Sequence, residues 1–380
     1  AGELAVPAKL STEEERIVTE DSDSLMCGGN RSVDENSMSG RNGGEGLAVE
    51  ETMETEFLQG IYVIQTEADG RFIKRMKEYP TYEEAAGACG VDEEILLLRQ
   101  EISGKSEWYN GLMPPDNLNP ESVKTFLKLT HEHYEEVFGG SFPKEVKGFF
   151  TDEPNCCDFF SVFHEGRPWI PWSIGFTEYF IEKRGYDPQE KLPYLFFDGE
   201  GAEKIRHDYW KTVAQRFEES YMKQVYEWCD KRGLRTTGHI LYENDLGYQT
   251  RVCGAAMPQL RYLHNPGIDL LGAQTDEYLT VKQCASVAHQ YDRSMTISEA
   301  YGCTGWELDF STQKWLGDWQ FALGITRRCQ HLALYSITGC RKRDYPPVFN
   351  YQNTWWDDND KMENYFGRLA LCLSQGEPVR

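Results

Sequence analysis

The sequence predicts an α/β fold, a (β/α)8 TIM-type barrel that is incomplete at its N-terminal strands. Short apolar runs alternate with amphipathic helical patterns through the second half of the chain, and polar side chains follow the runs. Strands that alternate with helices form right-handed βαβ units around a parallel sheet. A length of 380 residues and a hydrophobic content of 40% are sufficient for one large core.

The N-terminal region differs in composition from the rest of the chain. Residues 1–50 are rich in Glu, Ser, Gly and Asn with little apolar periodicity, which predicts a low-complexity or disordered segment. Residues 51–380 are expected to form one barrel domain, in which an Asp69-Gly70 turn predicts a hairpin at residues 57–75. Because the first 50 residues are too polar to supply strands, the first barrel strands are expected to be missing or rearranged.

Helix and strand signals are clearest after residue 118. Asn119 can cap a helix and Pro120 suits its first turn, with Val123, Phe126 and Leu127 on one face. Strands are expected at residues 93–100, 146–152, 235–241, 268–272, 294–298 and 332–337, and further helices at 177–184, 204–232, 281–290 and 315–329.

Composition excludes several classes of partner. A formal net charge of -23 provides no basic surplus to neutralise nucleic acid or an anionic membrane. Eleven cysteines without a C-x-x-C pair predict neither a zinc site nor a disulfide framework, and they favour the reducing cytoplasm. The sequence shows no membrane span and no signal peptide. The first residue is Ala rather than Met, so an upstream leader is left open, as is the oligomeric state.

Two carboxylates at predicted strand ends are the main catalytic candidates. The apolar run from Val146 ends in Asp152 and Glu153, because Pro154 cannot donate to a sheet ladder. Glu299 ends a later run, and the carboxyl ends of barrel strands converge on one pocket. Glu153 and Glu299 are therefore expected to face each other. Paired carboxylates hydrolyse glycosides, with separations of roughly 5 to 5.5 Å for retention and roughly 6.5 to 9.5 Å for inversion.

Other polar and aromatic residues near strand ends are candidate sugar ligands. Asp152 either contacts the sugar or orients Glu153, and His239 is either a sugar ligand or a satisfied core histidine. Glu243 is the rival of Glu299 for the second catalytic carboxylate. The substrate-binding candidates are Asp152, His239, Tyr242, Glu243, Tyr301, Trp306 and Arg341, for which ordinary packing or ion pairing is the competing interpretation.

Several motifs together carry a family resemblance. They are Asp116–Val123, Gly148–Pro154, Thr237-Gly238-His239, Pro266–Asp269, Ser298-Glu299 and Leu373–Val379. On these motifs the chain from about Trp108 to its end resembles the α-L-rhamnosidase-like glycoside hydrolases of family 106 and, more distantly, the clan A barrel glycosidases.

The resemblance implies a (β/α)8 catalytic domain with Glu153 as general acid and Glu299 or Glu243 as the second acid. It also implies an inverting mechanism, a bound calcium near the sugar whose ligands the sequence does not assign, and β-rich accessory domains. Asp152 stands where clan A enzymes usually carry Asn, which departs from the retaining pattern.

Three functional hypotheses follow. The first is a glycoside hydrolase that acts on a carbohydrate substrate with a terminal sugar such as an α-L-rhamnoside. The second is a catalytically inactive carbohydrate-binding barrel or truncated remnant. The third is a metal-dependent hydrolase that uses Asp152, His239 and Glu243.

Overall fold

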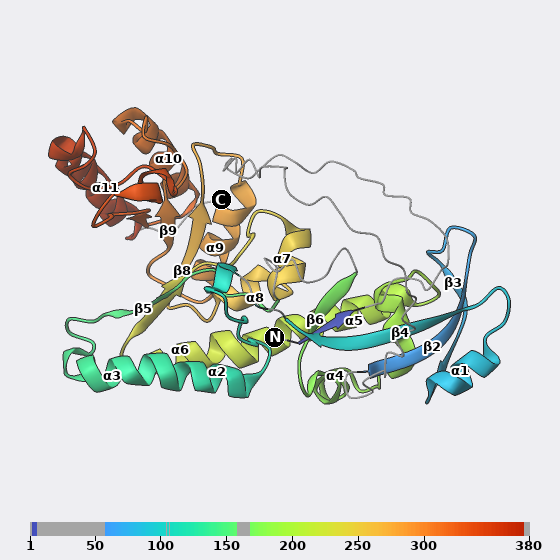
Figure 1. The fold of residues 1–380 in the computed structure, drawn as a ribbon. Helices are drawn as coiled ribbons and strands as arrows, with labels where there is room; N and C mark the ends of the chain where they lie inside the picture. The colour runs from blue at the N-terminus through green and yellow to red at the C-terminus, as the bar shows by residue number, and fades with distance from the viewer. Residues whose placement is uncertain (1, 6–57, 104, 106, 158–167, 376–380) are drawn as a thin grey trace, which may run out of the picture.

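The computed structural model describes residues 2–5, 58–103, 105, 107–157 and 168–375. Within these residues the strands form two five-stranded sheets, one in the order β3-β2-β4-β1-β6 and the other in the order β10-β9-β8-β7-β5. Figure 1 shows the two sheets at opposite ends of the molecule, with α5 and α6 running between them. Most of the predicted low-complexity segment 1–50 lies outside the described residues.

The first sheet is antiparallel throughout. Its strands are β1 Gly2–Ala5, β2 Leu58–Thr66, β3 Ile73–Tyr79, β4 Glu94–Ile102 and β6 Trp169–Trp172. Between β2 and β3 lies the predicted turn, where Gly70 takes a φ of 70°. Helix α1 (Tyr82–Ala88), capped by the Thr81 side chain, packs Ala85 on the face of β2 that carries Ile61 and Val63.

The second sheet is parallel. Its strands are β5 Gly148–Thr151, β7 Arg235–Gly238, β8 Asn265–Leu270, β9 Ile297–Ala300 and β10 Arg327–Gln330. The helices that follow its strands are α7 Leu246–Cys253, α8 Ala256–Leu260, α9 Tyr278–Gln290, α10 Phe310–Leu323 and α11 Asn359–Leu373. Strand β10 replaces the strand expected at 332–337.

The prediction of a (β/α)8 barrel is therefore wrong for the described part of the chain, where the parallel sheet is a half-barrel of five strands. The outer strands, β5 and β10, each pair with a single neighbour in that sheet. Residues 58–102 cannot contribute barrel strands because their short turns build antiparallel pairs, whereas parallel neighbours need a long crossover. Residues 107–147 supply helices in place of a strand beside β5.

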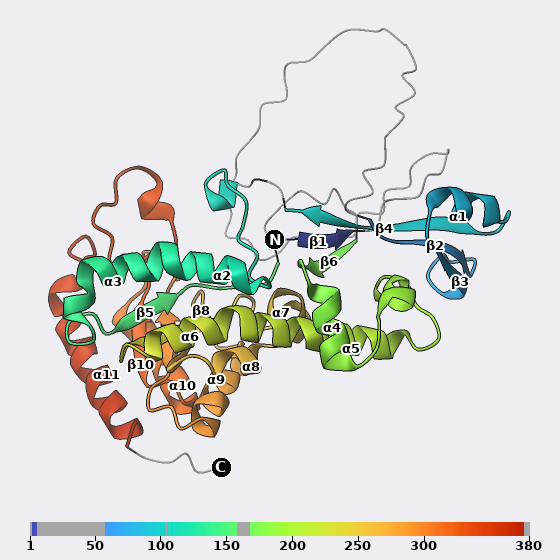
Figure 2. The ribbon, with the colours of Figure 1, turned by 90° about the horizontal axis from the view of Figure 1, so that it is seen from below.

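Two long helical segments lie side by side along β5. The first begins at Asn119, which caps α2 (Pro120–Leu127), and continues through a π-turn, Lys128–Glu132, into α3 (His133–Phe138). The second consists of α5 (Ala202–Phe217), a π-turn at Glu218–Met222 and α6 (Lys223–Asp230). Figure 2 shows the two segments alongside each other, and Phe126 stacks on Tyr221 between them. The 3-10 turns are Glu107–Tyr109, Gly139–Ser141, Gln189–Leu195, Gly339–Arg343 and Trp356–Asp358.

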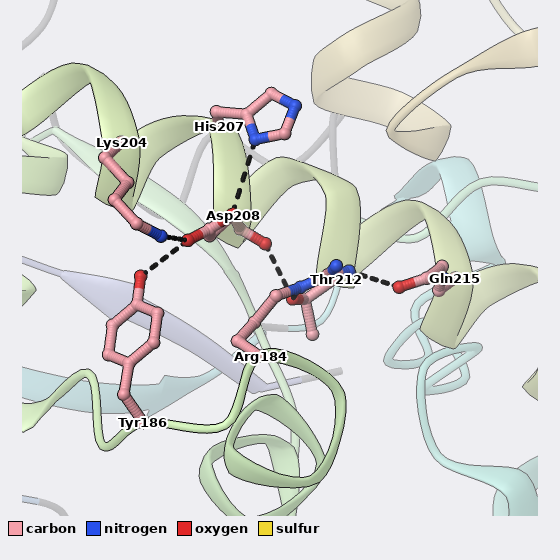
Figure 3. Close-up of polar contacts among 7 residues, drawn as sticks. All are labelled: Arg184, Tyr186, Lys204, His207, Asp208, Thr212 and Gln215. Carbon is pink, nitrogen blue, oxygen red and sulfur yellow. Dashed lines mark hydrogen bonds and ion pairs between the residues drawn. The ribbon is translucent and has the colours of Figure 1, made fainter.

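A polar cluster fastens α4 (Phe176–Arg184) and the turn after it to α5. Figure 3 shows this group, called here the Asp208 cluster, which consists of Arg184, Tyr186, Lys204, His207, Asp208, Thr212 and Gln215. The Tyr186 hydroxyl donates to Asp208 Oδ2 at 2.8 Å, and Lys204 pairs with the same oxygen. Arg184 Nε donates to Thr212 Oγ1 at 2.8 Å. Residues far apart in sequence are thus joined across two helices.

Apolar packing is continuous through the described residues. One large core includes residues of the antiparallel sheet such as Tyr62 and Leu98, and residues around the parallel sheet such as Phe217, Ile268 and Val281. The described helices are all too short or too polar to cross a membrane.

Candidate active site

Polar side chains gather where the strands of the parallel sheet end. This group, called here the strand-end cluster, consists of Asp152 and Glu153 after β5, His239 after β7, Asp269 in β8, Glu299 in β9 and His331 after β10. One potential ligand atom from each of Asp152, His239 and Glu299 lies within 4.8 Å of the others, and the same holds for Glu153, His239 and Asp269. Glu153 and Glu299, which lie 146 positions apart in the sequence, are thus placed around the same histidine, and the charge of Glu299 acts on Glu153.

Local sequence explains why β5 and β7 deliver their side chains to one place. Strand β5 ends at Thr151, three residues before Pro154. At the end of β7, a Cβ on Gly238 would lie 1.9 Å from the carbonyl oxygen of Thr151, and Gly238 has a φ of 139°. Only glycine allows this close approach. The following residues, Asp152 and His239, therefore become neighbours.

His239 is the centre of the strand-end cluster. Its side chain is 1% exposed, and Nε2 lies 3.1 Å from Asp152 and 3.9 Å from Asp269, while Nδ1 lies 3.8 Å from Glu299. Burial lowers the pKa of His239, but Asp152 and the charges of Glu243, Asp269 and Glu299 outweigh it and raise the pKa to about 9. The imidazole therefore carries a positive charge at neutral pH. Of the two interpretations that the sequence leaves open for His239, this burial favours the core histidine over the sugar ligand.

The carboxylates around His239 have different proton affinities. Burial raises the pKa of Glu153 and of Glu299, and it raises the pKa of Asp269 to about 7. Asp152 differs because its side chain is largely exposed and its contact with His239 lowers its pKa. The site therefore holds an ionised Asp152 beside a Glu153 that retains its proton to higher pH. Neighbouring carboxyl groups with separated pKa values are typical of acid–base catalytic sites.

Glu243 is turned toward the backbone. Its Oε1 accepts a hydrogen bond from the Ile240 N–H at 3.2 Å and its Oε2 accepts one from the Asp269 N–H at 3.0 Å. The side chain is buried, and burial raises its pKa. Both oxygens are thus occupied in holding the ends of β7 and β8 together. Glu299 is the carboxylate that lies next to both His239 and His331.

The remaining predicted ligands are not all at the site. Tyr242 lies near Glu153, whose charge adds to burial in raising its pKa. Tyr301 is 2% exposed and donates from its hydroxyl to the Gln313 carbonyl at 3.0 Å, so it belongs to the core. Trp306 donates from Nε1 to the Lys342 carbonyl at 2.6 Å. Arg341 is exposed in the 3-10 turn after β10.

Three residues of the site were not identified as such from the sequence. Asp269 lies within a motif that was noted only for its resemblance. His331 follows β10, whose sequence Arg-Arg-Cys-Gln lacks the apolar pattern of a strand. Tyr345 lies in a loop without periodicity, and its pKa is raised by burial, Cys303, Glu153, Asp344 and Asp269 in that order.

Backbone strain is concentrated in the loops around the strand-end cluster. Seven described residues other than glycine have a positive φ. Two are Asn110 and Asp292, types that tolerate this conformation. The other five are Glu153, Tyr242, Tyr301, Cys303 and Tyr345, all in the segments after β5, β7, β9 and β10. Such strain is typical of functional sites, where the surrounding structure holds side chains in required positions.

The metal donor sets among the described residues do not match calcium. Both sets contain His239, whereas calcium takes about six to eight oxygen ligands. Glu243 belongs to neither set, because its two oxygens accept hydrogen bonds from the Ile240 and Asp269 backbone N–H groups. We derive no chemical step through a metal.

Comparison with protein-family models identifies the family of this chain. Residues 115–380, more than half of the chain, match the model of glycoside hydrolase family 106, described as alpha-L-rhamnosidase. Among solved structures, the rhamnosidase from Novosphingobium sp. PP1Y is similar with a TM-score of 0.58 and 21% identity, over 76% of this chain and 28% of that one. The present chain thus spans little more than a quarter of that structure, and the likeness shows a shared fold. No curated protein matches the chain significantly.

Proposed function

Because the chain belongs to the alpha-L-rhamnosidase family of glycoside hydrolases, family 106, we propose that it hydrolyses a terminal α-L-rhamnoside with Glu153 as general acid and Glu299 as the second carboxylate. The observation that carries this proposal is the placement of both side chains around one buried, charged histidine, His239. Paired carboxyl groups of this kind protonate the leaving oxygen and supply the nucleophile or the base that activates water.

Glu153 is suited to the acid role. Burial raises its pKa, and although the His239 charge opposes this, the charges of Asp152 and Glu299 raise it further. A general acid has to hold its proton until the glycosidic oxygen begins to accept charge. Its positive φ of 45° directs the side chain after β5 in a conformation that an unconstrained glutamate avoids. Glu153 thus combines a retained proton with a fixed position.

Glu299 is suited to the partner role. Burial and the charge of Asp152 raise its pKa, and His239 and His331, 3.8 and 3.7 Å from its two oxygens, oppose that rise by stabilising negative charge there. A carboxylate that stays ionised beside a protonated acid attacks the anomeric carbon or removes a proton from water. Asp152, ionised and exposed, and Tyr242 are the proposed contacts for sugar hydroxyls.

The test is hydrolysis by the Glu153→Gln variant. Glutamine preserves size but cannot give up a proton, so kcat/KM should fall about 10²- to 10⁴-fold with alkyl α-L-rhamnosides and less with nitrophenyl ones. The matched control is Glu203→Gln on the exposed first turn of α5, which should leave both rates unchanged. A Glu153→Gln enzyme with wild-type turnover of the alkyl substrate would refute the assignment. Proton NMR of the first-formed sugar anomer shows whether Glu299 attacks directly or through water.

The open parallel sheet favours a second candidate, a carbohydrate-binding protein without turnover. Five described strands leave the outer edges of β5 and β10 unpaired in that sheet, and a loosely held site binds sugar more readily than it aligns two carboxylates. Saturable binding of L-rhamnose by the wild-type chain, with no cleavage across a panel of nitrophenyl glycosides, would identify this function.

A further inference from the structure

His331 links the end of β10 to Glu299. Its Nε2 lies 3.7 Å from Glu299 Oε1, and its backbone N–H donates to the Ala300 carbonyl at 2.9 Å, which extends the pairing of β10 with β9. Gly302 lies beside the ring, since a Cβ built there would be in ordinary van der Waals contact with His331 Cγ, at 3.5 Å. The imidazole is therefore held between the β9 loop and the catalytic carboxylate.

The loop after His331 is tied down at three points. At its base, the Phe349 N–H donates to the Leu332 carbonyl at 2.9 Å. Near its middle, Trp306 Nε1 donates to the Lys342 carbonyl at 2.6 Å, and the Gly305 N–H donates to the Pro346 carbonyl at 3.1 Å. The last two contacts flank Tyr345 on both sides in sequence. Trp306, a candidate sugar ligand from the sequence, uses its indole N–H to brace this loop.

Tyr345 projects from the braced loop toward the strand-end cluster. Its ring meets the His331 ring edge-on, with centroids 5.5 Å apart, and about half of its surface, 46%, is exposed. The charges of Glu153 and Asp269 act on its hydroxyl. Its φ of 48° is a strained conformation for tyrosine. The ring is thus held in a strained conformation with nearly half of its surface exposed, and such strain is typical of functional sites.

We propose that Tyr345 is a sugar-contacting residue whose ring covers the substrate between Glu153 and Glu299, with His331 as the positioning residue that holds the ring there. The inference rests on the proposed glycosidase function. An aromatic face packs against the apolar C–H face of a pyranose, and the 6-methyl group of a deoxy sugar adds apolar area to that contact. Tyr345 and Tyr242 then contact the sugar from two loops, after β10 and β7.

The test compares Tyr345→Ala, Tyr345→Phe and a control, Tyr351→Ala, with nitrophenyl α-L-rhamnoside as substrate and L-rhamnose as competing ligand. Tyr351 lies in the same loop and is 72% exposed. Loss of the ring should raise KM and the inhibition constant of L-rhamnose together, about tenfold, with kcat nearly unchanged. The Phe variant keeps the ring and should stay within about twofold of wild type, as should the Tyr351 variant.

The outcomes separate this inference from the proposed function. Wild-type constants in Tyr345→Ala would overturn the role of Tyr345 while the enzyme still hydrolyses rhamnoside. If the wild-type chain cleaves no glycoside, the proposed function fails, and titration of the wild-type and Tyr345→Ala chains with L-rhamnose by ligand-observed NMR decides the inference. Equal binding by the two chains, or none, would then overturn it. Unfolding curves of all three variants check that the ring, and not the fold, was lost.

Discussion

Two clusters of charged side chains in this protein have opposite electrostatic character. In the Asp208 cluster, burial of Asp208 is outweighed by Lys204, Tyr186 and His207, so the pKa of Asp208 is lowered. In the strand-end cluster, burial raises the pKa values of Glu153 and Glu299 despite the charge of His239. The first cluster satisfies its charge with hydrogen bonds; the second confines several carboxyl groups around one cation.

Unpartnered atoms show the same difference. Within the described residues, His239 Nε2, Asp269 Oδ1 and His331 Nδ1 are buried without a well-formed hydrogen bond. The 3.1 Å contact of His239 with Asp152 is short but is not aligned for one. The Asp208 cluster instead joins two helices through paired groups. Perturbed pKa values and buried atoms without hydrogen bonds lower the stability of the fold and are typical of functional sites. A cluster whose charges are paired stabilises the fold instead.

The largest effect is expected from removing the second carboxylate. Glu299→Gln should lower kcat/KM for an α-L-rhamnoside about 10²- to 10⁴-fold, because the amide neither attacks carbon nor removes a proton from water. The free energy of unfolding should be unchanged or slightly higher, since one buried negative charge is gone. Steady-state kinetics and urea unfolding measure the two quantities. A variant that is inactive only because it is unfolded would contradict the division between the clusters.

Removing the central cation should damage stability and activity together. His239→Gln leaves Asp152, Asp269 and Glu299 without their shared positive neighbour, and breaking a buried ion pair costs about 3–5 kcal/mol. Urea unfolding at pH 7 gives the stability loss. Lowering the pH to 5 should restore part of it by protonating the carboxyl groups. A variant as stable as wild type at pH 7 would show that His239 does not compensate these charges.

The Asp208 cluster should respond in the opposite way. Asp208→Asn removes the charged acceptor for Tyr186 and Lys204, so the free energy of unfolding should fall by about 2 kcal/mol. The value of kcat/KM per folded molecule should remain that of wild type. The matched control, Asp198→Asn, breaks an exposed ion pair with Arg206 and should change stability by less than about 1 kcal/mol. Reduced turnover by folded Asp208→Asn would show that the Asp208 cluster also contributes to activity, which would contradict the distinction between the two clusters.

A further expected effect is a pH dependence of stability. The folded pKa of His239 is raised to about 9 and that of Asp269 to about 7, both above their unfolded values. The folded state therefore binds more protons, and the free energy of unfolding falls as pH rises. As pH rises, the stabilisation from the protonated Asp269 is lost between about pH 4 and 7, and that from the protonated His239 is lost between about pH 6.5 and 9. Calorimetry should show Tm decreasing from pH 6.5 to 9, and a Tm that is constant or rises over this range would contradict the raised pKa of His239.

Sequence signals were sufficient where structure is local. The apolar run before Pro154 predicts β5, which ends at Thr151 just before Asp152 and Glu153, and the Ile297-Ser298 run predicts β9, which contains Glu299. Closure of the barrel could not be predicted correctly, because pairing of β1 with β4 and β6 depends on contacts distant in sequence. Strand β10 lies at the edge of the sheet and has a polar sequence without the apolar pattern of a strand, so neither the strand nor His331 after it was predicted. Tyr345 depends on loop contacts that carry no periodic signal.

The roles of Glu153 and Asp208 can be tested in one experiment. Wild type, Glu153→Gln and Asp208→Asn are assayed with the same alkyl α-L-rhamnoside, with kcat/KM normalised to the folded fraction from urea unfolding of each sample. We predict a loss of at least about 100-fold for Glu153→Gln with unchanged stability, and the reverse for Asp208→Asn. Glu153→Gln activity within about twofold of wild type would contradict the assignment of Glu153 as the acid of a glycosidase.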